Sequence, residues 1–240
     1  MHAETARLEH VAGWYSSRVG FYSQLVGYGF RTILPHLHGT TCLELGPADG
    51  QMTGMLLERF ARVVSVEGSR AYCDQLAERH RDDAGHEVVC SLFEDFTPAE
   101  RFDTVLGTHV LEHVEDPVAV LGRARGWVAP GGRMVMLVPN ALSLHRLVAV
   151  EMGMLDRPDA LNDLDVRLGH RRVYDLDLLE AHVREAGWEV VASGGNFLKP
   201  LSNGQMEAWF TPEMLDGFHA VGRQFPRHAA EVFVVAEPRA

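Results

Sequence analysis

The stretch Cys42-Leu43-Glu44-Leu45-Gly46-Pro47-Ala48-Asp49-Gly50 decides the fold class, because an apolar run ends in a tight turn and a helical pattern follows it. Glycine in such a turn lets the backbone come close to a bound ligand. Seventeen residues after Gly50, the strand-like run 63–66 ends in Glu67. An acidic side chain there can accept hydrogen bonds from both hydroxyls of a ribose. Together the two features predict an adenosine-containing ligand.

Outward from this stretch, strand-like and helix-like segments alternate along the chain. Strands are expected at 41–45, 63–67, 87–90, 104–108, 133–138, 189–193 and 231–236, and helices at 53–60, 70–80, 117–128 and 175–186, the last capped by Gly187. Alternating strands and helices need crossover connections, which favour a parallel sheet with helices on both faces. The expected fold class is therefore α/β, with a doubly wound, mostly parallel, seven-stranded sheet.

Composition limits the partners of the chain. A length of 240 residues fits one domain, and a net charge of −11 disfavours nucleic acid or anionic membrane as a partner. Three cysteines without a CxxC pair argue against a disulfide framework and a thiolate zinc site. Residues 1–10 lack a signal-peptide pattern, and no apolar run approaches the roughly 18 residues of a membrane span. We therefore expect a cytoplasmic protein; the sequence leaves a homodimer open.

The opening stretch resembles the first motif of class I S-adenosylmethionine-dependent methyltransferases, an acidic residue followed by alternating glycines. Glu44, Gly46 and Gly50 match, whereas Ala48 stands in place of the middle glycine. The resemblance continues through Glu67, Phe102-Asp103, Val110-Leu111-Glu112-His113-Val114 with Asp116-Pro117, and Pro130-Gly131-Gly132, and covers roughly 43–191. It implies a Rossmann-like sheet, S-adenosylmethionine as cofactor and methyl transfer to an oxygen or nitrogen of a small molecule in specialised-metabolite or cofactor biosynthesis. Part of the chain is similar to the ubiquinone-biosynthesis O-methyltransferase group.

By that resemblance the chain is one methyltransferase domain, 1–240. Residues 1–38, where apolar and aromatic residues recur at helical spacing, form a helical lid, and 41–139 form the cofactor-binding core. The segments 140–174 and 196–228 break the alternation. Insertions after strand ends lie near the ligand crevice of an open α/β sheet, so both are expected to cover the substrate.

The resemblance also assigns residues to the cofactor. Glu44 and the loop after it should hold the amino acid part, Glu67 the ribose, and His109 should face the methyl group. Leu92 and Phe93 should border the adenine, with Glu94 or a backbone amide reading its exocyclic amine. The full expected set is Tyr15, Tyr22, Glu44, Gly46, Pro47, Gly50, Glu67, Gly68, Leu92, Phe93, Glu94, Thr108 and His109.

Three other functions share some of these features. A dinucleotide dehydrogenase also has a glycine loop and a downstream acid, but the loop lacks G-x-G-x-x-G spacing and the LEHV and PGG segments have no role there. A methyltransferase of protein or RNA would need an open groove and, for RNA, a basic face. A non-catalytic cofactor-binding partner would bind S-adenosylmethionine without turnover.

Four histidines are candidates for the general base. His109 and His113 follow the fourth predicted strand, and His145 and His170 lie in the first insertion. If the acceptor is a hydroxyl, a base must remove its proton, and an imidazole with a pKa near neutral is suited to that. The catalytic residue is therefore expected among these four.

The spacing of His109, Glu112 and His113 would bring three metal ligands to one side of a helical turn. In some enzymes of the ubiquinone-biosynthesis group, which have a glutamate where His109 stands, this trio can hold a divalent ion. In many methyltransferases without a metal, the same LEHV segment only shapes the pocket. The metal question stays open, and we expect activity not to require an added ion.

Polar residues of the first insertion are candidates for binding the acceptor: Asn140, Arg171, Arg172 and Tyr174. The planar guanidinium of an arginine suits a carboxylate or a phosphate. A short basic run in an acidic chain also occurs as a solvated or ion-paired surface. We expect one of the two arginines to meet an anionic group of the substrate.

Overall fold

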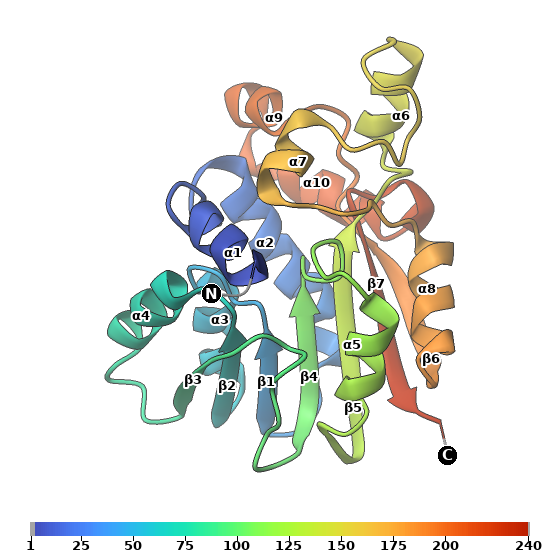
Figure 1. Cartoon of the computed structure of the whole chain (residues 1–240). Helices are drawn as coiled ribbons and strands as arrows, with labels where there is room; N and C mark the ends of the chain where they lie inside the picture. Colours follow the sequence, from blue (N-terminus) through green and yellow to red (C-terminus); the bar gives the residue numbers. More distant parts are fainter. Residues whose placement is uncertain (1–2, 240) are drawn as a thin grey trace.

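The computed structural model describes residues 3–239; positions 1, 2 and 240, which the expected lid and domain bounds include, lie outside this range. Its strands form one seven-stranded sheet in the order β3-β2-β1-β4-β5-β7-β6 (Figure 1). They are β1 (Thr41–Leu45), β2 (Arg62–Glu67), β3 (His86–Cys90), β4 (Phe102–Thr108), β5 (Val128–Pro139), β6 (Trp188–Asn196) and β7 (Glu231–Pro238). β7 runs antiparallel to both of its neighbours, β5 and β6, and the other neighbouring strands are parallel. The predicted α/β class, the seven strands and the mostly parallel sheet are confirmed.

Helices cover both faces of this sheet and the edge formed by the carboxyl ends of its parallel strands. They are α1 (Ala3–Ala12), α2 (Gly20–Ile33), α3 (Gln51–Arg59), α4 (Arg70–Arg79), α5 (Pro117–Ala124), α6 (Leu144–Glu151), α7 (Asp163–Leu168), α8 (Leu176–Glu185), α9 (Asn203–Trp209) and α10 (Pro212–Gly222). Two short 3₁₀ turns, η1 (Leu34–His36) and η2 (Pro226–His228), complete the elements. The sequence predicted α3, α4 and α8 within a few residues.

The core has two layers because successive strand residues point to opposite faces of the sheet. Leu43 of β1 and Val105 of β4 pack with α5 and α8 on one face. Their neighbours Cys42 and Leu106 pack with α2 and α3 on the other face. Both faces of the central strands are therefore buried, which explains their continuous apolar sequences.

Two helix ends show where local sequence signals succeed and fail. Gly187 follows α8 with φ +88°, as the predicted glycine cap requires. The helix predicted at 117–128 ends already at Ala124, because a turn closes at Gly126 and Trp127 and β5 begins at Val128. This part of the prediction was wrong: after Ala124, Trp127 lies in the turn and Val128 begins β5, so neither belongs to the helix.

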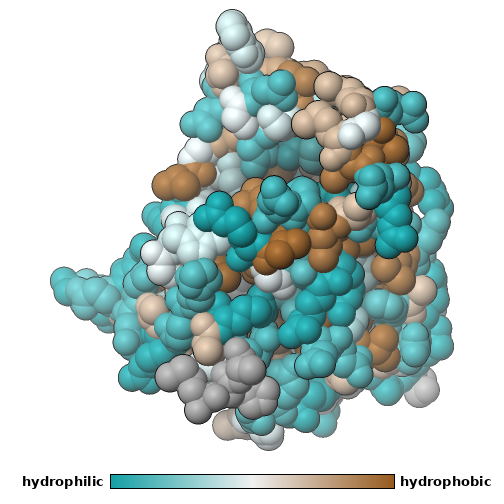
Figure 2. Space-filling model, turned by 45° about the horizontal axis from the view of Figure 1, so that its top comes forward, coloured by the Kyte–Doolittle hydropathy of each residue, from teal (hydrophilic) through white to brown (hydrophobic). Residues whose placement is uncertain are grey.

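The lid (residues 3–38) and the two insertions, 140–174 and 196–228, gather over the carboxyl ends of the parallel strands (Figure 1). Phe21 and Leu25 of α2 form a third apolar cluster with Phe197, Met206 and Leu215 of the second insertion. Hydrophobic patches show between hydrophilic ones on the face that this cover presents (Figure 2). The lid and the second insertion are thus packed on each other as one cover.

The lid is also fastened to the sheet by polar contacts. The hydroxyls of Ser16 and Ser17 donate to the Asp49 carboxylate in the loop after β1, and the Tyr72 hydroxyl donates to the backbone oxygen of Tyr15 at 2.9 Å. These contacts hold the lid against the loop after β1 and against α4. No helix within residues 3–239 has the length and apolarity needed to cross a bilayer.

Ala48 adopts φ +50°, a conformation that L-residues rarely take and that glycine takes freely. Ala48 stands in place of the middle glycine of the motif that this stretch resembles. We expect Ala48→Gly to raise the free energy of unfolding by up to about 1 kcal/mol, since the relief of roughly 1–2 kcal/mol exceeds the entropy that glycine gains in the unfolded chain.

The matched control is Ala181→Gly at an exposed position inside α8. There the same substitution should lower the free energy of unfolding by about 0.5–1 kcal/mol. Urea denaturation of the two variants measures both values. Equal losses in the two proteins would contradict the strain assigned to Ala48.

Candidate functional site

One cavity of about 970 Å³ lies between the carboxyl ends of the strands, the lid and both insertions. Pockets for small molecules range over roughly 300–1,000 Å³, so this one has room for a nucleoside cofactor and a second small molecule. The loop after β1 and the ends of β2 and β3 form the cofactor end, lined by Gly46, Ala48, Glu67, Gly68 and Leu92. The polar residues around His109, and those of the insertions, form the acceptor end.

At the cofactor end, two glycines lie where neighbouring side chains leave no room for a Cβ. Gly46 has φ +62°, and a Cβ there would lie 2.8 Å from Cγ2 of Val110. A Cβ on Gly68 would lie 2.5 Å from Cδ1 of Leu8 in the lid. Both glycines line the cavity, so a ligand can approach the backbone at these two points.

Glu67 ends β2 with its carboxylate on the cavity wall and 5% of its surface exposed. It accepts hydrogen bonds from the backbone N–H of Ala48 at 3.2 Å and of Ser69 at 2.8 Å. Burial raises the pKa of Glu67 to about 7. These bonds fix the carboxylate against the loop, and its remaining acceptor capacity suits the two hydroxyls of a ribose.

Glu44 and Gly50 do not line the cavity, unlike the other residues expected to hold the cofactor. The Glu44 carboxylate lies beneath the loop, where Thr53 and Ser65 donate to it at 2.7 and 2.8 Å, and burial raises its pKa to about 7. Gly50 precedes α3 with φ +80° and faces Leu76. The expectation that these two touch the cofactor is corrected: in this structure they support the loop that borders it.

The remaining residues expected at the cofactor all line the cavity: Tyr15, Tyr22, Gly46, Pro47, Glu67, Gly68, Leu92, Phe93, Glu94, Thr108 and His109. Tyr22 connects the two ends of the cavity. Its ring lies 6.0 Å from that of Tyr15 and 5.6 Å from that of His109, both in edge-on contact. Burial raises the pKa of Tyr22 well above its ordinary value, so its hydroxyl stays protonated.

His109 lies between two buried carboxylates. Its Nε2 is 2.5 Å from Oε1 of Glu231 and its Nδ1 is 3.5 Å from Oε1 of Glu112. Burial alone would lower the pKa of His109, but the two carboxylates raise it above its ordinary value. The backbone of His109 has φ +56°, which turns the ring toward Glu231 at the start of β7. The arrangement favours the imidazolium form, which cannot itself accept a proton.

The metal-ligand trio expected from the sequence is not the one that the fold assembles. Ligating atoms of Glu112, His113 and His170 lie within 4.8 Å of one another, so His170 takes the place of His109. Residues 111–113 form a turn instead of a helix. The first insertion crosses over this turn, where the backbone N–H of Arg171 donates to the backbone oxygen of Glu112 at 2.8 Å. The imidazole of His109 is instead bonded to the carboxylate of Glu231.

Glu112 is the fully buried member of this cluster, and His113 and His170 are partly buried. Neither carboxylate oxygen of Glu112 has a hydrogen-bond partner, and burial raises its pKa. Burial and the neighbouring His170 lower the pKa of His113 well below its ordinary value. The rings of His113 and His170 meet edge to face at 4.6 Å. A buried carboxylate without a hydrogen-bond partner therefore lies at the cavity wall beside neutral His113.

His145 and Lys199 form the part of the acceptor end that the insertions supply. The backbone N–H of His145 donates to the backbone oxygen of Lys199 at 3.1 Å, while Nδ1 of the His145 ring is buried without a partner. Burial, with Lys199 and Arg146 nearby, lowers the pKa of His145 to about 3. All four histidines proposed as bases thus line one cavity.

Arg171, Arg172 and Tyr174 are placed away from the cavity, contrary to expectation. Arg172 donates to the backbone oxygens of Leu111, Val114 and Glu115, and Arg171 binds the His113 oxygen and Glu4. Tyr174 is fully buried, with its hydroxyl 3.1 Å from Nδ1 of His182. Arg171 and Arg172 thus bind the turn around Glu112, and none of the three side chains lines the cavity.

Asn140 alone of the four residues proposed to bind the acceptor lines the cavity, although its amide is engaged with the backbone oxygens of Arg227 and Ala229. Sequence reasoning did not single out Glu231, and it noted Lys199 only as one of the residues of the second insertion that suit a substrate wall. Glu231 could have been found from the antiparallel direction of the last strand, which brings its first residue to the cavity edge. Lys199 carried a signal as the sole lysine of the chain.

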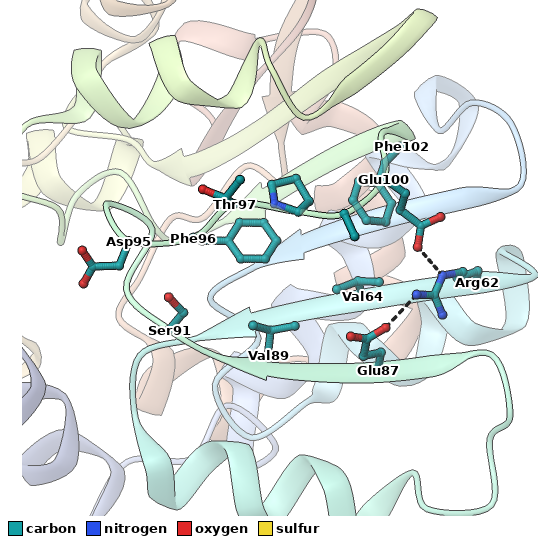
Figure 3. A pocket seen from close by; sticks show the side chains of 12 residues that line it. Arg62, Val64, Glu87, Val89, Ser91, Asp95, Phe96, Thr97, Glu100 and Phe102 are labelled. Carbon is teal, nitrogen blue, oxygen red and sulfur yellow. Dashed lines mark hydrogen bonds and ion pairs between the residues drawn. The ribbon is translucent and has the colours of Figure 1, made fainter.

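A smaller hollow of about 370 Å³ lies on the sheet face beside β2 and β3, where residues 91–101 pass without forming a helix (Figure 3). Arg62 lies between Glu87 and Glu100, bonded to each at 2.6 Å (Figure 3). The ion pairs tie the loop to the sheet. Arg62 engages two of the three acids that line this hollow, and the hollow lacks the glycine loop and the cluster of buried titratable groups that line the larger cavity.

Comparison with known proteins agrees with this geometry. A family model described as a methyltransferase domain matches residues 21–193. The ubiquinone biosynthesis O-methyltransferase of Bradyrhizobium sp. (strain ORS 278) is 35% identical over 107 residues, 43% of this chain and 42% of that protein. The enzyme of the same name from Rhodopseudomonas palustris (strain BisB5) is 26% identical over 200 residues, 79% of this chain and 73% of that protein. The first of these matches thus spans less than half of the relative.

The fold is shared with solved methyltransferases. The N-methyltransferase NodS from Bradyrhizobium japonicum WM9, in complex with S-adenosyl-L-homocysteine, superposes with a TM-score of 0.64 over 99% of each chain, at 14% identity. At this identity the likeness concerns the fold, whereas the family match covers most of the sequence. The chain belongs to the class I S-adenosylmethionine-dependent methyltransferases.

Proposed function

We propose that this enzyme methylates an oxygen or nitrogen atom of a small polar molecule, held inside the cavity under the lid. The observation that carries the proposal is that one cavity has two connected ends. The cofactor end is lined by Gly46 and Glu67, and the other end holds a cluster of buried titratable side chains under the lid. S-Adenosylmethionine supplies the methyl group on a sulfonium, a good leaving group, so the protein mainly has to align the nucleophile and remove its proton. A cavity closed by the lid and both insertions suits a small acceptor better than a protein or RNA chain.

We further propose Glu112, supported by His109, as the group that accepts the proton. Glu112 is fully buried at the wall of the cavity, its two oxygens have no hydrogen-bond partner, and its raised pKa brings it closer to the operating pH that general-base catalysis favours. His109 is held as a cation by Glu231, so it can stabilise the Glu112 carboxylate but not take up a proton itself. His113, His145 and His170 are the alternative bases.

Glu112→Gln should lower kcat for a methylated acceptor by roughly 10²–10⁴-fold, because glutamine keeps the shape of the side chain and cannot accept the proton. Cofactor affinity should stay close to that of the unchanged protein. Formation of S-adenosylhomocysteine over a panel of small hydroxyl and amine acceptors measures kcat. Glu151→Gln, at an exposed residue of α6, is the control and should have no effect.

Alanine variants of His109, His113, His145 and His170 complete this experiment. A normal kcat in Glu112→Gln with a large loss in one of the three alternative histidines would assign the proton to that histidine. No turnover on any acceptor, with the cofactor bound, would instead favour a non-catalytic binding partner.

Glu67→Ala should weaken binding of S-adenosylmethionine by about 1–3 kcal/mol, because it removes the acceptors for two ribose hydroxyls. Isothermal titration calorimetry measures the affinity, with the thermal unfolding midpoint as the check on folding. Unchanged affinity in a folded Glu67→Ala protein would remove the ribose assignment.

Activity should not depend on an added divalent ion, although Glu112, His113 and His170 could reach one metal together. His113 already lies against His170, and methyl transfer needs no Lewis acid when a carboxylate takes the proton. The test is turnover after EDTA treatment, followed by addition of magnesium or a transition metal. Loss of activity with EDTA and recovery with metal would identify these three side chains as ligands.

A further inference from the structure

Lys199 is the sole lysine of the chain, and it lines the acceptor end of the cavity with only 8% of its surface exposed. It lies in the loop that follows β6. Its ammonium donates to Oδ1 of Asn203 at 2.7 Å and forms no ion pair with a carboxylate of residues 3–239. An ammonium has three donors, so most of its hydrogen-bonding capacity is unused. A buried charge without a counterion is costly unless a ligand supplies one.

The groups around Lys199 do not neutralise it. Arg146 is engaged by the backbone oxygens of Pro158 and Ala160 and by Asp165 at 3.3 Å. His145 beside it is neutral at physiological pH, and its buried Nδ1 lacks a partner. The carboxylate of Glu231 is bonded to His109 at 2.5 Å and to Nδ2 of Asn196 at 2.5 Å. Within residues 3–239, Lys199 is therefore the cation of this group that no carboxylate binds directly.

We propose that Lys199 binds a carboxylate group of the methyl acceptor, so that the substrate is a small hydroxy or amino acid. This inference rests on the function proposed above and specifies its substrate class. One uncompensated charge matches a monoanion better than a phosphate dianion, which would leave a charge unpaired in a buried site. A carboxylate has two oxygens, and Nδ1 of His145, when it carries the proton, can donate to the second one.

The cavity then has two electrostatic poles that orient the acceptor. Lys199 lies in the second insertion, whereas Glu112 faces the cavity from the turn after β4. A hydroxyl or ammonium group of the acceptor is a donor and fits the unbonded oxygens of Glu112. The carboxylate at the other pole fixes which end of the molecule points to the cofactor.

Matched acceptors test this assignment. Aminobenzoates, hydroxybenzoates and aliphatic amino acids are each compared with their primary amides, which keep the shape and lose the charge. The unchanged enzyme should prefer the acid in kcat/KM. In Lys199→Met the kcat/KM for acids should fall roughly 10- to 100-fold, mainly through KM, while the amides should change little. Lys199→Arg should restore part of the preference, since it restores the charge.

Controls separate the two proposals. Arg157→Met, which removes an exposed cation of the first insertion, should leave the preference unchanged. Equal use of acids and amides by the unchanged enzyme, or an equal loss of kcat for both in Lys199→Met, would overturn the carboxylate site and leave the methyltransferase function standing. Turnover of no acceptor, with S-adenosylmethionine bound, would overturn the proposed function itself.

A readout without turnover uses the fact that Lys199 is the sole lysine. Trinitrobenzenesulfonate should modify this side chain in the presence of S-adenosylhomocysteine, and peptide mass mapping separates it from the amino terminus. A preferred acid should slow the modification and its amide should not. Equal protection by both, with the cofactor product bound, would contradict the proposal independently of any methylation.

Discussion

The contact between His109 and Glu231 is the interaction on which the acceptor end depends. β7 runs antiparallel beside β5, so its first residue pairs with Pro139 at the edge where the parallel strands end. His109 lies at the same edge, with its N–H bonded to the Leu137 oxygen at 2.8 Å. Reversal of one strand therefore places a carboxylate against the first residue after β4. That carboxylate sets the charge of His109 and, through it, the environment of Glu112.

The fold and the cofactor end could be predicted because their signals are local. Strands buried on both faces give continuous apolar runs, and the turn at Gly46 needs a residue without a side chain where Val110 comes close. Glu67 ends such a run, so its position follows from the strand itself. The error at α5 has the same origin, since the apolar residues after Ala124 fit a helix as well as the strand that they form.

The acceptor end could be predicted only in part, because its residues meet through long-range contacts. All four proposed histidines reach the cavity, but the charge of each depends on partners elsewhere in the chain, such as Glu231 for His109 and Lys199 for His145. The irregular insertions have no periodicity that fixes a side chain's direction. Arg172 illustrates the difficulty. Its guanidinium can bind an anion or backbone oxygens, and the sequence does not distinguish the two; in the fold it binds backbone oxygens.

The polar groups left unpaired show how stability and function are balanced here. Both oxygens of Glu112 and Nδ1 of His145 are buried without partners, and each such atom costs about 1–3 kcal/mol. Glu112, His145 and Lys199 all line the same cavity. A bound acceptor can supply partners to such groups, and the water that it displaces would otherwise weaken these contacts. The groups that cost the folded protein most at this cavity are thus the ones that can distinguish one small molecule from another.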